Sequence, residues 1–319
     1  MSVYIRKYEY SMGAGNWIYK GYASAYQALG EEVVYYNEFP YGKLKGNKIM
    51  IMDLDLCYDF DSKLETLKEA EKVFLFASPN WFPEPWGSHP NYVNSVSKNI
   101  EYVNRINECE NFTLWNFSSL DKEEQKKYFP YWKRLRQIPL AFDQHSYKRI
   151  EDPNWKYDVA YCGGWADNGH NSKAERMKEV FKVFKETELK CGFFVNKNLT
   201  HEQECKLLMN SKICINIHDT YQTCLGLDTN ERTFKSLGMN GTLVSDDINQ
   251  IRKLFEPIYF NGIICAKSVK DMVEAVQEYL SIDHETLENY KEKNRQNILE
   301  KHTYDNRIEM LENFQWKRF

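Results

Sequence analysis

The stretch Asn230-Glu231-Arg232-Thr233-Phe234-Lys235-Ser236-Leu237-Gly238, followed by Gly241-Thr242-Leu243-Val244-Ser245-Asp246-Asp247, contains an amphipathic helix, a glycine stop and a short apolar strand. Phe234 and Leu237 lie three residues apart and face one way, whereas Arg232 and Lys235 lie on the other side. In doubly wound folds, ligands bind at the amino ends of helices, where free backbone N–H groups hold anions. The pattern therefore predicts one helix–strand unit of a parallel sheet, with a candidate anion site where the helix begins.

The rest of the chain alternates apolar, strand-like runs with helical patterns. In the first half, strands are expected at residues 3–5, 32–36, 48–52 and 72–76, with helices between them. An irregular, polar region covers residues 138–153, and a second alternation follows from the strand at 157–162. The pattern predicts an α/β protein with two parallel-sheet domains, which suits a chain of 319 residues. We place the first domain at residues 1–145, the second at 146–300, and a C-terminal helix, which can cross back to the first domain, at 301–319.

Composition excludes several classes of protein. The hydrophobic fraction is 42%, which is that of a globular chain, and the net charge of −4 gives no global basic field for nucleic acid or an acidic membrane. A local basic patch at residues 126–136 remains open. The eight cysteines are scattered without zinc-site spacing, and no signal peptide or apolar run of about 18 residues is present. We therefore expect a cytoplasmic protein with no membrane span and no bound metal.

Two motifs carry a resemblance to a known family. The 230–238 run resembles the donor-site helix of GT-B glycosyltransferases, especially the CgeB-like (spore-maturation) group, which reads Asn-x-Arg-x-Phe-Glu and then glycine. The second domain opens with a strand that ends in Gly163-Gly164, followed by Arg176 in a helix, and this order is similar to that of the same group. The resemblance implies a GT-B fold, in which two Rossmann-like domains face each other across a cleft and the second binds a nucleotide sugar.

The resemblance also implies a set of site residues. Arg232 is the central one, since its guanidinium can pair bidentately with phosphate oxygens and stabilise the charge of the departing diphosphate. His218 and Asn216 alternate with apolar residues in a strand that the resemblance brings to the donor site. The expected catalytic residues are Arg232, His218 and His89. The expected donor-binding residues are Gly13, Gly15, Gly163, Gly164, Arg176, Asn216, Asn230, Glu231 and Lys235.

Lys235 departs from the family pattern, which has glutamate at this position. That glutamate holds the ribose hydroxyls, and lysine cannot accept their hydrogen bonds. Either Asp228 or Glu231 makes the contact instead, or the nucleotide is bound differently. Lys235 itself either faces the donor or lies on the solvated side of the helix, and we favour the donor-facing position.

The function we infer is transfer of a sugar from a nucleotide-diphosphate donor, expected to be a UDP-sugar, to an acceptor hydroxyl. We expect a metal-independent, retaining reaction without a cofactor; neither the sugar nor the acceptor can be deduced. Three alternatives stay open. The chain could glycosylate a hydroxylated DNA base, it could be a GT-A-type enzyme holding a metal with Asp53 and Asp55, or it could be a nucleotide-sugar binder without turnover.

Overall fold

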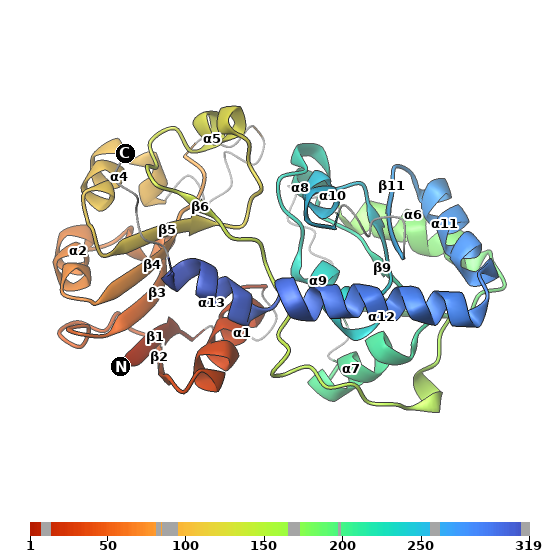
Figure 1. Cartoon of the computed structure of the whole chain (residues 1–319). Helices are drawn as coiled ribbons and strands as arrows, with labels where there is room; N and C mark the ends of the chain where they lie inside the picture. The colour runs from red at the N-terminus through yellow and green to blue at the C-terminus, as the bar shows by residue number, and fades with distance from the viewer. Residues whose placement is uncertain are drawn as a thin grey trace. The chain divides into compact units, whose positions relative to one another are not determined.

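The computed structural model describes residues 1–7, 14–80, 84, 95–164, 173–196, 199–255 and 262–313; for residues 14–16 only the backbone is described (Figure 1). The chain divides into two compact units, each built around its own parallel sheet. Unit 1 comprises Met1–Pro139 and Arg307–Phe319, and unit 2 comprises Leu140–Asn306.

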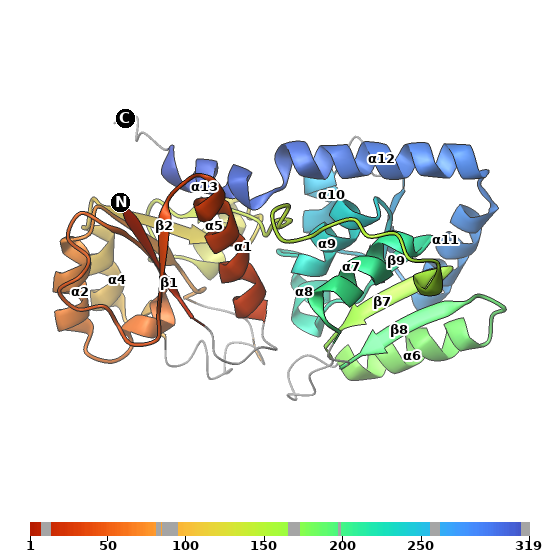
Figure 2. The same ribbon diagram turned by 90° about the horizontal axis from the view of Figure 1, so that it is seen from below.

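Unit 1 contains a six-stranded sheet in which every paired strand runs parallel to its neighbour. In spatial order the strands are β2 (Glu32–Tyr36), β1 (Ser2–Arg6), β3 (Lys48–Met52), β4 (Lys72–Phe76), β5 (Phe112–Asn116) and β6 (Arg136–Gln137). The helical elements are α1 (Ala14–Ala28), η1 (Asp53–Leu56), α2 (Phe60–Lys68), η3 (Val96–Lys98), α4 (Ile100–Asn107), α5 (Lys122–Tyr128) and α13 (Tyr304–Glu312). Figure 2 shows α2 and α4 on one face of this sheet and α1 and α13 on the other.

Unit 2 contains a five-stranded parallel sheet. In spatial order its strands are β11 (Ile263–Ala266), β10 (Leu243–Asp246), β9 (Ile213–Asn216), β7 (Val159–Gly163) and β8 (Cys191–Val195). The helical elements are η4 (Pro153–Trp155), α6 (Lys173–Lys185), α7 (His201–Asn210), α8 (Thr220–Leu225), α9 (Glu231–Met239), α10 (Asn249–Phe255), α11 (Val269–Ser281) and α12 (His284–Lys301). The core on one face joins α6 and α11 to the strands, with Phe184, Met272 and Val276 fully buried.

Helix α9 forms where the sequence predicts a helix, but its surroundings differ from an amphipathic surface helix. Asn230 caps it by accepting a hydrogen bond from the backbone N–H of Arg232 at 3.2 Å. Every residue from Arg232 to Met239 is buried, because α9 packs against β9 and β10 on one side and against α7 and α12 on the others. Gly238 is required at its position, because a Cβ there would overlap the ring of Phe142.

The strand order of each sheet reverses at one point, and such switch points hold the ligand in doubly wound folds. In unit 1 the reversal lies between β1 and β3, and in unit 2 it lies between β7 and β9. A ligand site is therefore expected at the carboxyl ends of these strands. In unit 2 those ends carry Gly163 and Asn216.

The end of α13 is fixed to unit 1 by a cluster of charged groups. The carboxylate of Glu312 forms ion pairs with Lys48 and Lys72, each at 2.8 Å, and accepts a hydrogen bond from the hydroxyl of Tyr26 at 3.2 Å. Burial pushes the pKa of Glu312 up, but the two lysines outweigh it and hold that pKa below its ordinary value. The chain thus returns to unit 1 after finishing unit 2.

Candidate functional site

Arg232 bridges the switch point of unit 2. Its Nε donates to the carbonyl oxygen of Cys162 at 2.6 Å, near the end of β7, and its Nη1 donates to Oδ1 of Asn216 at 2.8 Å, at the end of β9. The guanidinium carbon lies 4.6 Å from the ring centroid of Tyr161, a cation–π contact. Only 8% of Arg232 is exposed. A buried cation is therefore fixed between the two strands that define the ligand crevice of this sheet.

Gly163 provides the space that Arg232 occupies. A Cβ at this position would overlap the guanidinium of Arg232, so no other residue fits without moving the arginine. At Gly164 the atom nearest to an added Cβ would be Oδ1 of Asn196, at 3.8 Å, which is ordinary contact. The first glycine is therefore needed for packing against Arg232, whereas a Cβ at the second would make only ordinary van der Waals contact with the described residues.

Asn216 organises the groups around Arg232. Its Oδ1 accepts from Arg232, and its Nδ2 donates to Oδ1 of Asn230 and to Oγ1 of Thr233, both at 2.9 Å. The amide is thus oriented by its partners on α9 and fixes the plane of the guanidinium. Asn216 therefore positions Arg232.

His218 lies in the same polar network, 1% exposed. Its Nε2 lies 2.7 Å from Oγ1 of Thr229, and its Nδ1 lies 3.4 Å from Oγ of Ser245 and 3.7 Å from Oδ2 of Asp246. Burial lowers the pKa of His218, with Asp246 opposing the shift, so the imidazole is neutral at pH 7. Both ring nitrogens face protein groups, which suits a structural role better than the catalytic role predicted from the sequence.

Arg176, expected near the donor diphosphate, pairs with Asp246. Its Nε donates to Oδ1 of that carboxylate at 2.6 Å, while the backbone N–H of His218 donates to Oδ2 at 2.7 Å. Asp246 closes β10, so this pair joins α6 to the carboxyl edge of the sheet.

Lys173 is a residue of this region that the sequence reasoning did not identify. It is the first residue of α6 and is 9% exposed, with Nζ 3.2 Å from Oδ1 of Asp219. Burial, followed by the charge of Arg232, lowers the pKa of Lys173. The two buried cations Lys173 and Arg232 are therefore within electrostatic reach of each other. The signal available in the sequence was a lysine at the start of the helix that follows a strand and a glycine turn.

Lys235 forms a buried ion pair with a residue of α7. Its Nζ lies 3.3 Å from Oε1 of Glu204 and 5.5 Å from the ring centroid of Tyr147, whose hydroxyl donates to Oε2 of Glu204 at 2.8 Å. Burial raises the pKa of Glu204, but Lys235 and Tyr147 outweigh it and leave that pKa below its ordinary value. Lys235 is 8% exposed, so the alternative that placed it on a solvated helix face is wrong.

The two neighbours considered as substitutes for the family glutamate lie at the start of α9. Glu231 is in its first turn. Asp228 accepts from Nε2 of Gln222 at 2.9 Å and from the hydroxyl of Tyr221 at 3.4 Å, both on α8. Burial raises the pKa of Asp228 to about 6. Its carboxyl is therefore turned toward α8.

Asp53 and Asp55 are both occupied by protein partners. Asp53 is fully buried and accepts from the backbone N–H and the hydroxyl of Ser78, at 3.0 and 2.8 Å, and from the hydroxyl of Ser97. Asp55 pairs with Arg6 and accepts from the backbone N–H of Met52 at 3.2 Å. Among the described residues, no group of three or more His, Cys, Asp or Glu side chains is arranged to hold a metal.

Replacing Asp53 by alanine is expected to lower the free energy of unfolding by about 2–3 kcal/mol, because three buried donors lose their acceptor. Burial raises the pKa of Asp53, so the folded state binds this proton more tightly than the unfolded chain. Its contribution to stability is therefore largest below the unfolded pKa and declines as the pH rises through the folded pKa. Urea unfolding of the wild type, Asp53→Ala and Asp53→Asn at pH 4, 5.5 and 7 tests both points. An Asp53→Ala protein as stable as the wild type at every pH would contradict this role.

Several predicted features lie elsewhere. Gly13 and His89 are outside the described residues, and Gly15 is in the first turn of α1. In the basic patch at 126–136, Lys126 pairs with Glu123 at 2.8 Å, whereas Arg134 and Arg136 donate to the carbonyl oxygens of Cys109, at 3.2 Å, and Met310, at 2.7 Å. Within the described ranges, no helix combines the length and the apolar character that crossing a membrane requires.

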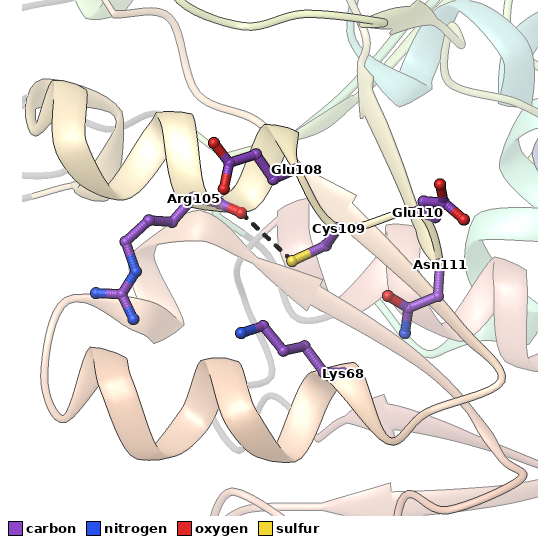
Figure 3. A pocket seen from close by; sticks show the side chains of 6 residues that line it. All are labelled: Lys68, Arg105, Glu108, Cys109, Glu110 and Asn111. Carbon is purple, nitrogen blue, oxygen red and sulfur yellow. Dashed lines mark hydrogen bonds between the residues drawn. The ribbon is translucent and has the colours of Figure 1, made fainter.

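A depression of about 460 Å³ on unit 1 is a weaker candidate site than the switch points. It is lined by Lys68, Arg105, Glu108, Cys109, Glu110 and Asn111 (Figure 3). These residues come from the ends of α2 and α4 and the turn that leads into β5. They therefore lie at the amino edge of the sheet, opposite the edge where parallel sheets bind ligands.

A family model matches the second half of the chain. Residues 159–313 match the family model described as glycosyl transferase-like, and this range contains Arg232, Lys173 and Asn216. A search of curated protein sequences found no match.

Two of the similar solved structures match over nearly the whole chain, and a third matches over most of it. T4 phage β-glucosyltransferase has 9% identity and a TM-score of 0.54, covering 98% of this chain and 100% of its own. WaaG, a glycosyltransferase involved in lipopolysaccharide biosynthesis, has 10% identity, a TM-score of 0.50 and the same coverage. TarM has 14% identity and a TM-score of 0.53 over 83% of this chain, which spans only 53% of the TarM chain. At such identities the likeness establishes the fold alone.

The fold is GT-B, as the sequence predicted. The alternative of a GT-A enzyme is wrong, because that architecture has a single domain and this chain has two sheets. The family match over residues 159–313, together with this fold, supports a glycosyltransferase.

Proposed function

We propose that unit 2 binds a nucleoside-diphosphate sugar at its switch point and that the chain transfers the sugar to a hydroxyl of an acceptor held by unit 1. The observation that carries the proposal is the position of Arg232, bonded to the ends of both β7 and β9. A diphosphate between Gly163 and the start of α9 would meet this guanidinium where open α/β sheets bind phosphates.

In this proposal the two buried cations do the main chemical work. Departure of the nucleotide places negative charge on the diphosphate, and Arg232 and Lys173 stabilise that charge in a site with little water. Asn216 holds Arg232 in position, so the site needs little reorganisation as the bond breaks. The donor we propose is a UDP-sugar.

Transfer with retention of configuration is the stereochemistry we propose. Asp53 and His218 are buried, with their polar atoms engaged by protein groups, so neither is placed to take a proton from an acceptor. The proton of the acceptor hydroxyl would then pass to the departing phosphate as the new bond forms. The anomeric configuration of the first-formed product, read by proton NMR, tests this point.

We expect full transferase activity in excess EDTA. The reason is that Arg232 and Lys173 already provide positive charge for the diphosphate, while Asp53 and Asp55 are engaged with Ser78 and Arg6. Turnover is measured with and without EDTA, then with added Mn²⁺ or Mg²⁺. Loss of turnover in EDTA that Mn²⁺ restores would show that the reaction needs a metal.

Measurements of nucleotide binding and of turnover distinguish a transferase from a nucleotide-sugar-binding protein without activity. Thermal unfolding in the presence of UDP, GDP and ADP reports binding, and slow release of free sugar from the matching nucleotide sugar reports turnover. Stabilisation by UDP together with hydrolysis of a UDP-sugar is the expected result. Stabilisation without hydrolysis or transfer would favour the nucleotide-sugar binder.

A further inference from the structure

The loop between β3 and α2 lies at the switch point of unit 1. It runs through η1 and ends at Tyr58 and Asp59, immediately before α2. Because β3 ends and α2 begins at the carboxyl edge of the sheet, this loop borders the crevice between β1 and β3. Tyr58 is 83% exposed and makes no hydrogen bond or ring contact among the described residues.

Tyr41, from the segment that follows β2, is fixed beside this loop. Its hydroxyl donates to Oδ2 of Asp59 at 2.6 Å, and its ring meets that of Phe39 edge-on, with centroids 4.7 Å apart. Ser62 donates to the other oxygen of Asp59 at 2.7 Å. Tyr41 is nevertheless 45% exposed. The ring is thus held in one orientation while much of its surface stays open to a ligand.

Asp59 adopts a backbone conformation that non-glycine residues rarely take. Its φ is 54°, in the left-handed region, and such positions occur most often in turns and at functional sites. The conformation places its carboxylate where both Tyr41 and Ser62 reach it. The strain thus helps to hold a carboxylate and a tyrosine ring next to each other at the edge of the crevice.

The charged residues around the two tyrosines indicate which class of ligand this surface can bind. Asp59 and Glu38 are exposed carboxylates, whereas Lys63 is directed to the carbonyl oxygen of Asp55, at 2.6 Å, and to the ring of Phe39. A nucleic acid requires cations for its phosphates, and the carboxylates of Asp59 and Glu38 would repel those phosphates. Exposed aromatic faces beside a hydrogen-bond acceptor suit a neutral, hydroxylated ligand, whose C–H groups pack on the rings while its hydroxyls donate to the carboxylate.

We propose that Tyr41, Tyr58 and Asp59 form the acceptor-binding platform of unit 1 and that the acceptor is a neutral saccharide. The proposal rests on the proposed function, because it takes unit 1 as the acceptor-binding unit. Tyr58 covers one face of the sugar, Tyr41 provides the fixed ring, and Asp59 accepts from a sugar hydroxyl. None of the three residues contributes to donor binding in this assignment.

The test is binding of short oligosaccharides to the full-length protein, measured by calorimetry. The probes are maltotetraose, cellotetraose and chitotetraose, with tetragalacturonate and a single-stranded DNA 20-mer as charged comparisons. We expect at least one neutral probe to bind, with an affinity lowered at least tenfold by Tyr58→Ala and by Tyr41→Ala. Leu29→Ala is the matched control: Leu29 is 59% exposed just after α1, at the opposite edge of the sheet, and its loss should leave the affinity unchanged.

UDP affinity, measured on the same proteins, separates this proposal from the proposed function. The Tyr58→Ala protein should bind UDP as the wild type does, since Tyr58 belongs to unit 1 and makes no contact that the fold needs. Normal UDP binding without saturable binding of any neutral probe would overturn the acceptor proposal alone. Equal saccharide affinity in Tyr58→Ala and the wild type, or Tyr58-dependent binding of the DNA or the galacturonate, would also overturn it.

Discussion

Replacement of Arg232 by alanine should reduce kcat/KM about a thousandfold, equivalent to about 4 kcal/mol of transition-state stabilisation. The guanidinium is the cation fixed at the switch point of unit 2, so the departing diphosphate loses its main electrostatic partner. Steady-state kinetics with the UDP-sugar that the wild type accepts gives the measurement. UDP affinity should fall as well, which calorimetry measures directly.

Two comparisons separate this catalytic effect from a loss of folding. Arg232→Ala also leaves the carbonyl of Cys162 and Oδ1 of Asn216 without their donor, at a cost of about 1–2 kcal/mol in the free energy of unfolding. Arg232→Lys keeps the charge but loses the rigid fork, so it should remain folded and recover only a small part of the activity. Near-normal turnover in a folded Arg232→Ala protein would show that the donor site is elsewhere.

Replacing Lys235 by glutamate should lower the free energy of unfolding by about 3 kcal/mol. The change removes the cation paired with Glu204 and puts a second carboxylate beside it, where both side chains are only 10–14% exposed. Urea unfolding at pH 7 gives the value. Lys178→Glu is the control, because Lys178 and its partner Glu175 are both at least 60% exposed, and a change there should alter stability by under about 0.5 kcal/mol.

A charge exchange tests the pair itself. The double variant Glu204→Lys/Lys235→Glu restores opposite charges and should recover most of the stability that either single change removes. It also places a carboxylate on α9 at the position where the resemblance expects one. Comparing UDP with GDP affinity in the double variant and the wild type then asks whether position 235 contributes to nucleotide choice. Wild-type stability in the Lys235→Glu single variant would contradict the account of this pair.

The sequence predicted the local elements well where a pattern of a few residues decides them. The helix that begins after Asn230 is present because its cap and its apolar residues are encoded within one stretch. The strands at 48–52 and 72–76 were found because buried parallel strands are short, continuous apolar runs. The strand at 32–36 lies at the edge of its sheet and is only partly buried, and its valines and tyrosines, which favour strands, identified it. The GT-B fold followed from two such alternations together with the resemblance in the second one.

Features that depend on distant parts of the chain were not deduced. The sequence of α9 has an amphipathic pattern, yet the helix is buried on all sides, because α12, which begins more than forty residues further along the chain, packs across it. The partner of Lys235 is Glu204, 31 residues away, and no local pattern pairs them. Lys173 was overlooked for the same reason, since its position beside Arg232 arises only when α6 and α9 pack on the sheet.

Several site predictions remain predictions. Arg232, Gly163, Asn216 and Asn230 are brought together by the fold, whereas Arg176 is turned to Asp246 and His218 is enclosed by Thr229 and Ser245. A polar residue at a strand end can point into the ligand crevice or into the network beneath it. The two cases share one sequence pattern, since alternation fixes the face of the strand but not the depth of the side chain.

We propose that Arg232 and Lys173 hold the diphosphate of the donor, and a crystal structure of the full-length protein with bound UDP is the decisive test. We expect the diphosphate at the carboxyl ends of β7 and β9, with its oxygens within hydrogen-bonding distance of the Arg232 guanidinium and the Lys173 ammonium, about 2.7–3.2 Å. A diphosphate bound at any other place, with Arg232 still directed only to Cys162 and Asn216, would contradict it.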